Sequence, residues 1–337
     1  MYAGVMETRL FGPTGRHVGV VGVGTWQFGG DWGDVSDQTA LDVLDAAVQA
    51  GVTLIDTADV YGDGHSEQLI GQFLRSVGTD ADRLTVITKM GRRADPHVAS
   101  AYTYDNFRAW LDRSRTNLGV EQIQLVQLHC PPTAVYCDAQ VYDALDRLVD
   151  EGVIGAYGVS VERVDEAMTA LEHGIASIQI ICNVLRHRPL QQVIPAAAAK
   201  SVAIIARVPL ASGLLTGKFS ESTVFAPQDH RTYNRHGEAF DVGETFAGVP
   251  YDAGVAAGRE MVRIAAEVDG NPTPAQVALR WLIDQPGITS VIPGASSPDQ
   301  VRANAAAAAL PSLAPDIVAQ LDQVYATYAA PYVADRW

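Results

Sequence analysis

The sequence predicts an α/β protein that folds as a single (β/α)8 TIM barrel, and three patterns lead to this prediction. Short runs rich in Val, Ile and Leu alternate with longer stretches of helical periodicity. Most of the short runs are apolar at successive positions, as is typical of strands buried on both faces of a parallel sheet. Several helical stretches end at a glycine that precedes the next apolar run, which gives a repeated strand–helix unit. Eight runs are predicted barrel strands: 18–23, 53–56, 84–89, 123–129, 154–160, 177–182, 202–208 and 289–293.

The N-terminal segment predicts a β-hairpin in front of the barrel. Residues 7–11 and 17–21 flank the turn Gly12-Pro13-Thr14-Gly15, and this arrangement favours two antiparallel strands. We expect the hairpin to cap the closed end of the barrel.

The predicted helices follow in chain order. Ser36 is a suitable N-cap for a helix over 36–50, in which Leu41, Leu44 and Val48 recur at helical spacing, and Gly51 ends it. Stretches 104–118, 139–151 and 164–173 end in the same way, each at a glycine. A further helix is expected to begin near Pro274.

The longest interruption follows the seventh predicted strand and reaches the helix near Pro274. A connection of this length within a compact domain is usually a functional loop or lid, here over residues 219–258. We find no domain boundary and predict one barrel domain over 1–337. A doubly wound open sheet is the alternative, but the segment after the first strand holds only Gly22 and Gly24 of a GxGxxG fingerprint.

Composition narrows the class of protein. The 24 basic and 39 acidic residues give a net charge of −15, which argues against nucleic-acid binding. No apolar stretch is long enough for a membrane span, and residues 1–10 lack the pattern of a secretory signal. Cys130, Cys137 and Cys182 match no zinc or CxxC spacing and suggest reduced thiols. We therefore expect a cytoplasmic protein; the sequence does not indicate its oligomeric state.

Polar side chains gather where the predicted strands end, which is where barrel enzymes place their chemistry. Asp56, Lys89 and His129 end three strands, and Tyr61 follows Asp56 in a loop. An ammonium next to a phenol lowers the phenol's pKa from about 10 and makes proton exchange easier. Asp56 would hold Lys89 in place, and His129 could orient a substrate oxygen. None of these groups transfers electrons, so a reductase built on them needs a hydride carrier.

These residues resemble the aldo-keto reductase superfamily. The matching segments occur in the family's order between about Leu10 and Asn304: Asp-Thr-Ala-Asp-Val-Tyr-Gly at 56–62 with Ser66-Glu67, Thr88-Lys89, Leu-Val-Gln-Leu-His at 125–129, Gly158-Val159-Ser160, Pro-Leu-Ala-Ser-Gly-Leu-Leu-Thr-Gly-Lys at 209–218, and 292–304, which begins Ile-Pro-Gly-Ala.

The resemblance implies reversible reduction of an aldehyde or ketone, and a small-molecule carbonyl or alcohol as partner. It implies that Tyr61 is the general acid and base, that Lys89 and Asp56 tune it, and that His129 orients the carbonyl. It further implies that NADP(H), or else NAD(H), binds without a Rossmann fold, and that no metal is needed. The implied cofactor contacts are Gly24, Thr25, Trp26, Ser160, Gln179, Pro209, Leu210, Ser212, Gly213, Lys218, Gly294, Ser296, Gln300 and Asn304.

Three departures from the family pattern concern the cofactor. Val161 stands where the family usually has Asn, and Cys182 stands where an aromatic residue often stacks on the nicotinamide. The adenosine segment 294–300 lacks the Lys or Arg that usually meets the 2′-phosphate of NADP. Either the enzyme accepts NAD(H), or cations come from elsewhere; Arg231 and Arg235 in the long loop are the candidates.

Candidate substrate contacts are Trp26, Met90 and Tyr102, with Trp110 less favoured, and residues 332–337 could reach over the mouth. The polar residues around Arg92, Arg93 and His97 would permit sugars or other hydroxylated carbonyls as substrates. Two other functions are conceivable. A metal-dependent barrel hydrolase could use Asp56, Asp59, His65 and His129, and a cofactor-sensing accessory subunit would bind coenzyme with little turnover.

Overall fold

The computed structural model describes residues 6–30 and 35–337, so the prediction for residues 1–10 lies partly outside the described residues. It begins with the predicted hairpin, β1 (Thr8–Leu10) and β2 (His17–Gly19), which pair antiparallel. Phe11 in the turn is fully buried against Leu54, Ile87 and Leu125, which belong to three barrel strands. The hairpin therefore plugs the N-terminal end of the barrel, as predicted.

Eight parallel strands follow and form the barrel. Neighbours in sequence are neighbours in the sheet, and the bridges Val21↔Val291 and Gly24↔Gly294 close the circle. The predicted barrel is confirmed. The first barrel strand begins later than predicted, because residues 17–19 pair with β1 instead. The strands are β3 (Val23–Gly24), β4 (Leu54–Asp56), β5 (Thr85–Met90), β6 (Leu125–His129), β7 (Tyr157–Val161), β8 (Ser177–Ile181), β9 (Ala203–Arg207) and β10 (Ser290–Val291).

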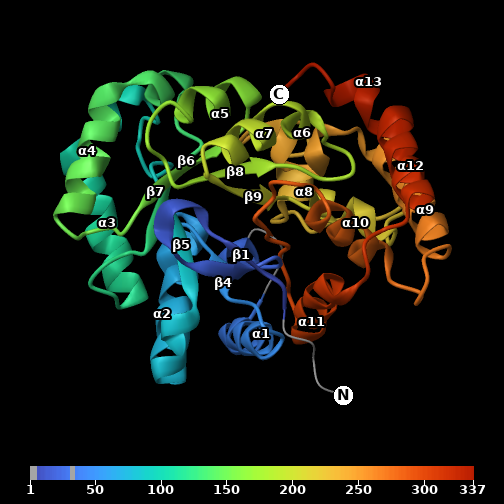
Figure 1. Ribbon diagram of the computed structural model, residues 1–337, viewed down its shortest axis with the longest axis horizontal. Helices are drawn as coiled ribbons and strands as arrows, with labels where there is room; N and C mark the ends of the chain where they lie inside the picture. Colours follow the sequence, from blue (N-terminus) through green and yellow to red (C-terminus); the bar gives the residue numbers. More distant parts are fainter. Residues whose placement is uncertain (1–5, 31–34) are drawn as a thin grey trace.

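Helices surround the strands (Figure 1). The first begins where predicted, because the Ser36 side chain accepts a hydrogen bond from the Thr39 amide. The third ends at Gly119, which adopts the left-handed conformation that glycine tolerates. The helices are α1 (Asp37–Gln49), α2 (His65–Val77), α3 (Tyr104–Leu118), α4 (Ala139–Asp150), α5 (Val164–Ala170), α6 (Arg188–Gln191), α7 (Val193–Ala199), α8 (His230–Tyr233), α9 (Tyr251–Ala265), α10 (Pro274–Ile283), α11 (Pro298–Ala306), α12 (Pro315–Val324) and α13 (Ala330–Val333).

The long connection after β9 contains short helices and is partly buried. It contains α8 and the start of α9, and Asn234 holds its fold together. The Asn234 side chain accepts hydrogen bonds from the amides of Ala239 and Phe240 and donates to Thr245 Oγ1. Hydrogen bonds within the segment therefore define its shape at the barrel mouth.

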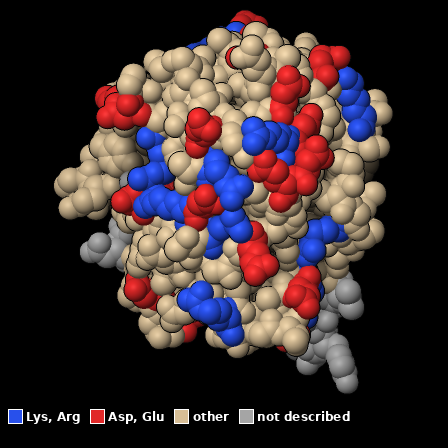
Figure 2. Space-filling view, turned by 90° about the vertical axis from the view of Figure 1, so that its left-hand side faces the viewer, with Lys and Arg blue, Asp and Glu red and all other residues tan. Residues whose placement is uncertain are grey.

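Charge on the surface is mixed. Figure 2 shows Lys and Arg gathered on one face, with Asp and Glu among them. Helices α3 and α4 lie on that side of the molecule, and there Arg108 pairs with Asp112 and Glu151 while Arg113 pairs with Asp63. No described helix combines the length and apolar character that crossing a membrane would require.

Candidate active site

A cavity of about 520 Å³ opens at the C-terminal ends of the barrel strands. Tyr61, His129 and Gln179 line one part of it. From there it extends past the loops after β9 and β10 to the first turns of α10 and α11, where Pro274 and Gln300 line it. One cavity thus joins the predicted reacting groups to two helix N-termini, which favour anions.

Tyr61, Lys89 and Asp56 form one connected group. The Lys89 Nζ donates to Asp56 Oδ2 at 2.7 Å, to the Thr57 carbonyl at 2.9 Å and to the Tyr61 hydroxyl at 3.4 Å. Lys89 and Asp56 are almost completely buried, whereas Tyr61 reaches the cavity. The ammonium uses its three hydrogens in a fixed geometry and touches the phenol that the sequence singled out.

The proton affinities of this group differ in one respect from expectation. Burial raises the pKa of Tyr61 above its usual value, and the nearby Lys89 ammonium opposes this only in part. The net lowering that we predicted is wrong, because the carboxylates of Asp56 and Glu244 also disfavour a phenolate. Burial lowers the pKa of Lys89, but Asp56 and Tyr61 outweigh it and raise that pKa overall. Lys89 is charged and Tyr61 keeps its proton at neutral pH.

His129 completes the reacting end of the cavity as a neutral imidazole. Burial, with Arg92 and Lys89 nearby, lowers the pKa of His129 well below its ordinary value. Its ring lies edge-on to Tyr61, with 6.0 Å between the ring centroids and planes at 84°. Within the described ranges, Nδ1 of His129 is buried and has no hydrogen-bond partner. A neutral imidazole next to the phenol can donate a hydrogen bond to a substrate oxygen.

Most of the predicted cofactor contacts line this cavity, but Thr25 and Ser160 do not. The Thr25 hydroxyl donates to the Asp56 carbonyl, beneath the cavity surface. Ser160 is buried, 3.7 Å from Cys130 Sγ, and its carbonyl accepts a hydrogen bond from Tyr136. The residues that line the cavity as predicted are Gly24, Trp26, Gln179, Pro209, Leu210, Ser212, Gly213, Lys218, Gly294, Ser296, Gln300 and Asn304.

The loop after β9 is tied to the long connection at Ser212. The Ser212 hydroxyl accepts from the Phe246 amide at 3.1 Å and lies 3.3 Å from the Glu244 carbonyl, to which it donates. Its φ of 53° lies in the left-handed region, as does that of Gly213. A turn in this strained conformation is held by its surroundings and brings backbone close to the cavity.

The two loop arginines proposed as cofactor contacts have different environments. Arg231 lines the cavity and forms an ion pair with Asp229, with 2.5 Å between Nη2 and Oδ2. Arg235 does not line it, because its guanidinium lies 4.8 Å from the centroid of Tyr251 and its Nε donates to the Arg231 carbonyl. Of these two arginines, Arg231 is the one placed to meet a ligand in the cavity.

A second charged group lies at the cavity wall and was not predicted from the sequence. Arg92 pairs with Glu244 at 2.5 Å, and Arg207 pairs with Glu162 at 2.9 Å. Burial raises the pKa of Glu162, whereas Arg92 and Arg207 lower the pKa of Glu244 in spite of its burial. Two carboxyl groups, one with a raised and one with a lowered pKa, therefore lie between two guanidiniums. Long-range contacts create this group, since Glu244 comes from the long connection.

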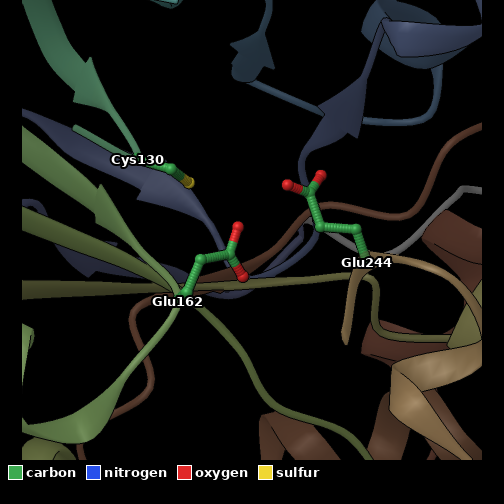
Figure 3. Close-up of side chains that lie close together, drawn as sticks. All are labelled: Cys130, Glu162 and Glu244. Atoms are coloured by element: carbon green, nitrogen blue, oxygen red, sulfur yellow. The ribbon is translucent and has the colours of Figure 1, made fainter. Parts of the chain in front are cut away.

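Glu162 and Glu244 also lie close to Cys130, with their side chains turned toward one another (Figure 3). Three such ligand atoms within 4.8 Å could suggest a metal site. The donor set fits a resident metal poorly, because Arg92 and Arg207 already occupy the carboxylate oxygens. Burial also raises the pKa of the Cys130 thiol to about 12, which disfavours the thiolate that a metal would need.

The metal-hydrolase alternative loses its proposed ligands. Asp56 is bound to Lys89, and His65 pairs with Asp37 on the surface. Asp59, His65 and His129 do not come together with Asp56 as a metal-binding group in the part of the chain that the structure describes.

The expected substrate contacts are only partly placed on the cavity. Trp26 lines it and stacks on Tyr61, with 6.1 Å between ring centroids. Met90, Tyr102 and Trp110 do not line it; Tyr102 is held by His97 at 2.8 Å. Phe240 packs edge-on against Trp26 but does not line the cavity, and nothing local in the sequence links the long connection to Trp26.

Two further expectations concern Cys182 and the C-terminal residues. Cys182 is fully buried and does not line the cavity, and the expectation that stacking on the nicotinamide is weaker or comes from another residue stays a prediction. Trp337 does not reach over the mouth either. Its indole lies 3.6 Å from the Arg186 guanidinium and donates to Asp241 Oδ1 at 3.0 Å.

The chain is similar to known proteins over nearly its whole length. The family model described as "Aldo/keto reductase family" matches residues 20–326. An uncharacterized oxidoreductase of Mycobacterium tuberculosis is 35% identical over 86% of this chain and 84% of its own. A probable voltage-gated potassium channel subunit beta of rice (Oryza sativa) is 26% identical over 95% of this chain and 96% of its own. A glycerol dehydrogenase structure from Gluconobacter oxydans superposes with a TM-score of 0.77 at 25% identity, covering 100% and 99%. An aldo-keto reductase from Klebsiella pneumoniae in complex with NADPH gives 0.71 at 23%, covering 95% of each chain.

Proposed function

The chain belongs to the aldo-keto reductase family, and from that premise we propose that this NADP-dependent oxidoreductase interconverts an aldehyde or ketone and the corresponding alcohol, with Tyr61 as the proton donor and acceptor. One observation carries the proposal: Lys89 contacts both Asp56 and Tyr61 at the base of a cavity that His129 also lines. A protonated phenol and a neutral imidazole then face the same space. That pair suits a carbonyl oxygen on which negative charge develops.

The residues that line the cavity fit a pyridine dinucleotide. Gln179 offers an amide at the reacting end, and the loop 209–218 brings backbone and Lys218 to the middle of the cavity. Ser296 precedes α11, and Gln300 and Asn304 lie in its first two turns, where the three residues would hold the adenosine end. Arg231 would supply the positive charge for a 2′-phosphate. When bound, NADP(H) supplies the hydride.

The protein's own groups account for the rest of the reaction. His129 holds the carbonyl oxygen by a hydrogen bond and orients it toward Tyr61. Tyr61 donates its proton to that oxygen as charge develops on it, and the Lys89 ammonium stabilises the phenolate left behind. Asp56 keeps Lys89 charged and in position. In the reverse direction Tyr61 takes the proton from the alcohol.

The test is stopped-flow absorbance at the reduced-nicotinamide band with a panel of aldehydes and ketones, run with NADPH and with NADH. We expect turnover that prefers NADPH, and we expect Tyr61→Phe to lose about 10²–10⁴-fold in turnover while its affinity for NADPH is retained. Unchanged turnover in Tyr61→Phe would contradict the assigned role. Tight NADPH binding without turnover on any carbonyl would instead favour a cofactor-sensing subunit.

A further inference from the structure

A layer of polar side chains crosses the barrel interior beside Asp56 and Lys89. The sheet register places Lys89 opposite Gln127, Gln127 opposite Gly158, and Gly158 opposite Ser177. The side chains of Lys89, Gln127 and Ser177 are at most 1% exposed. A Cβ at Gly158 would come within 2.3 Å of Ser177 Oγ, so the glycine leaves the space that this hydroxyl fills.

The layer ends at Gln179, whose nitrogen makes two hydrogen bonds. Gln179 Nε2 donates to Asp56 Oδ1 at 2.7 Å and to Gln127 Oε1 at 3.1 Å. Gln127 Nε2 in turn donates to Ser177 Oγ at 2.9 Å. Because Asp56 is ion-paired with Lys89, its carboxylate only accepts hydrogen bonds, so the nitrogen of Gln179 must face it.

Both N–H hydrogens of Gln179 are used inside the protein as a result. Its remaining polar atom, Oε1, receives no hydrogen bond from any group in the described ranges, and Gln179 lines the cavity. An acceptor at the cavity surface gains a hydrogen bond when a ligand with an N–H donor lies against it. The cavity therefore presents an acceptor, and no donor, at this point.

We propose that Gln127 is a positioning residue that fixes the Gln179 amide, so that the site selects coenzymes whose pyridine ring carries an N–H donor. This inference rests on the proposed function, because it takes the ligand to be a reduced pyridine dinucleotide. Gln127 does not touch the ligand. It accepts a hydrogen bond from the second N–H of Gln179. Without Gln127, the Gln179 amide could rotate about its hydrogen bond to Asp56 and turn this N–H toward the cavity.

The experiment compares two reduced coenzymes by equilibrium binding, measured as quenching of tryptophan fluorescence. NADPH carries a carboxamide with an N–H donor, whereas its 3-acetylpyridine analogue carries a ketone without one. We expect the wild-type chain to bind NADPH about ten-fold more tightly than the analogue. In Gln127→Leu the freed N–H can donate to the acetyl oxygen, so we expect this preference to fall by roughly three-fold or more.

Gln124→Leu is the matched control. Gln124 directly precedes β6, and among the described residues its side-chain amide accepts from the Val86 amide and donates to the Leu84 carbonyl, away from the cavity. The Gln124→Leu variant should prefer NADPH over the 3-acetylpyridine analogue to the same extent as the wild-type chain. Ser177→Ala is a milder variant that removes the partner of Gln127, and we expect it to lower the preference in the same direction.

The outcomes separate this inference from the proposed function. A wild-type chain that binds both coenzymes equally overturns the inference even if Gln127→Leu does not fold. A folded Gln127→Leu with the wild-type preference overturns it as well, and so does an equal fall in Gln124→Leu. Failure of the wild-type chain to bind either coenzyme would overturn the proposed function itself.

Discussion

Tyr61 illustrates how the surroundings of a single residue set its chemistry. The sequence placed it near Lys89, and from that pair alone a more acidic phenol was expected. The folded chain adds burial and the carboxylates of Asp56 and Glu244, which together outweigh the ammonium and raise the pKa of Tyr61. A phenol that keeps its proton is suited to the acid role in carbonyl reduction, with Lys89 acting mainly on the phenolate once it forms.

Arg231 and Arg235 differ in what they contact. Arg231 lines the cavity, whereas Arg235 is packed on Tyr251. We expect Arg231→Ala to raise KM for NADPH about ten-fold or more and to leave KM for NADH nearly unchanged, because only NADPH carries the 2′-phosphate. Steady-state kinetics with both coenzymes gives the ratio of the two values. Arg235→Ala is the control and should not change that ratio; an equal effect on both coenzymes in Arg231→Ala would remove the assignment.

At the scale of elements, the long connection after β9 is the part of the barrel that most affects the site. It delivers Glu244 to Arg92 and Arg207, and it sets Phe240 against Trp26. Trp337 holds this segment from outside: its indole donates to Asp241, and a Cβ at Gly248 would meet its ring at 2.4 Å. The last part of the chain thus supports the wall of the cavity without lining it.

Trp337 tests how far this element supports the site. Trp337→Ala removes a buried ring, which typically costs about 3–5 kcal/mol, and frees the segment that carries Glu244 and Phe240. We expect a lower melting temperature and a KM for the carbonyl substrate raised several-fold, with kcat changed less. Trp337→Phe keeps a ring over Arg186 and should give intermediate values. A lower melting temperature with wild-type KM would limit Trp337 to a purely structural role.

For the whole molecule, Asp59 makes stability depend on pH. Both of its carboxylate oxygens are buried without a hydrogen-bond partner among the described residues. Burial, with a smaller effect of Glu67, raises the pKa of Asp59 to about 7 from 3.8. A carboxyl group whose pKa is raised by folding stabilises the protein fully below pH 3.8, and this stabilisation is lost as pH rises through about 7.

We therefore expect Asp59→Asn to reduce the fall in melting temperature between about pH 5 and pH 8, since the amide cannot ionise. At about 1.4 kcal/mol for each pKa unit, the whole shift from 3.8 to about 7 is worth at most roughly 4 kcal/mol, and roughly 3 kcal/mol of that is lost between pH 5 and pH 8. Differential scanning calorimetry measures the melting temperature at each pH. A single unfolding transition in the same experiment would support one domain over 1–337. Asp63→Asn is the control. Arg93 lowers the pKa of the Asp63 carboxyl group, which therefore titrates below this pH range. Equal pH profiles for wild type and Asp59→Asn would contradict the prediction.

Local sequence patterns predicted much of the fold. Each predicted strand overlaps an observed one, because strands buried on both faces leave continuous apolar runs. Gly119 ended a helix as predicted, since it adopts a left-handed conformation there. The first barrel strand was placed too early: it was predicted from residue 18, but Val18 and Gly19 pair with β1, and β3 begins only at Val23.

The barrel, its hairpin cap and the grouping of Asp56, Tyr61, Lys89 and His129 at one rim could be predicted from the sequence alone. This was possible because residues at the ends of successive parallel strands meet wherever the strands form one barrel. Only the tertiary structure decided which of Arg231 and Arg235 meets the cavity, that Glu244 joins Arg207, and which way the amide of Gln179 faces. These features depend on contacts between distant segments and on the balance of burial against charge, and no local pattern encodes that balance.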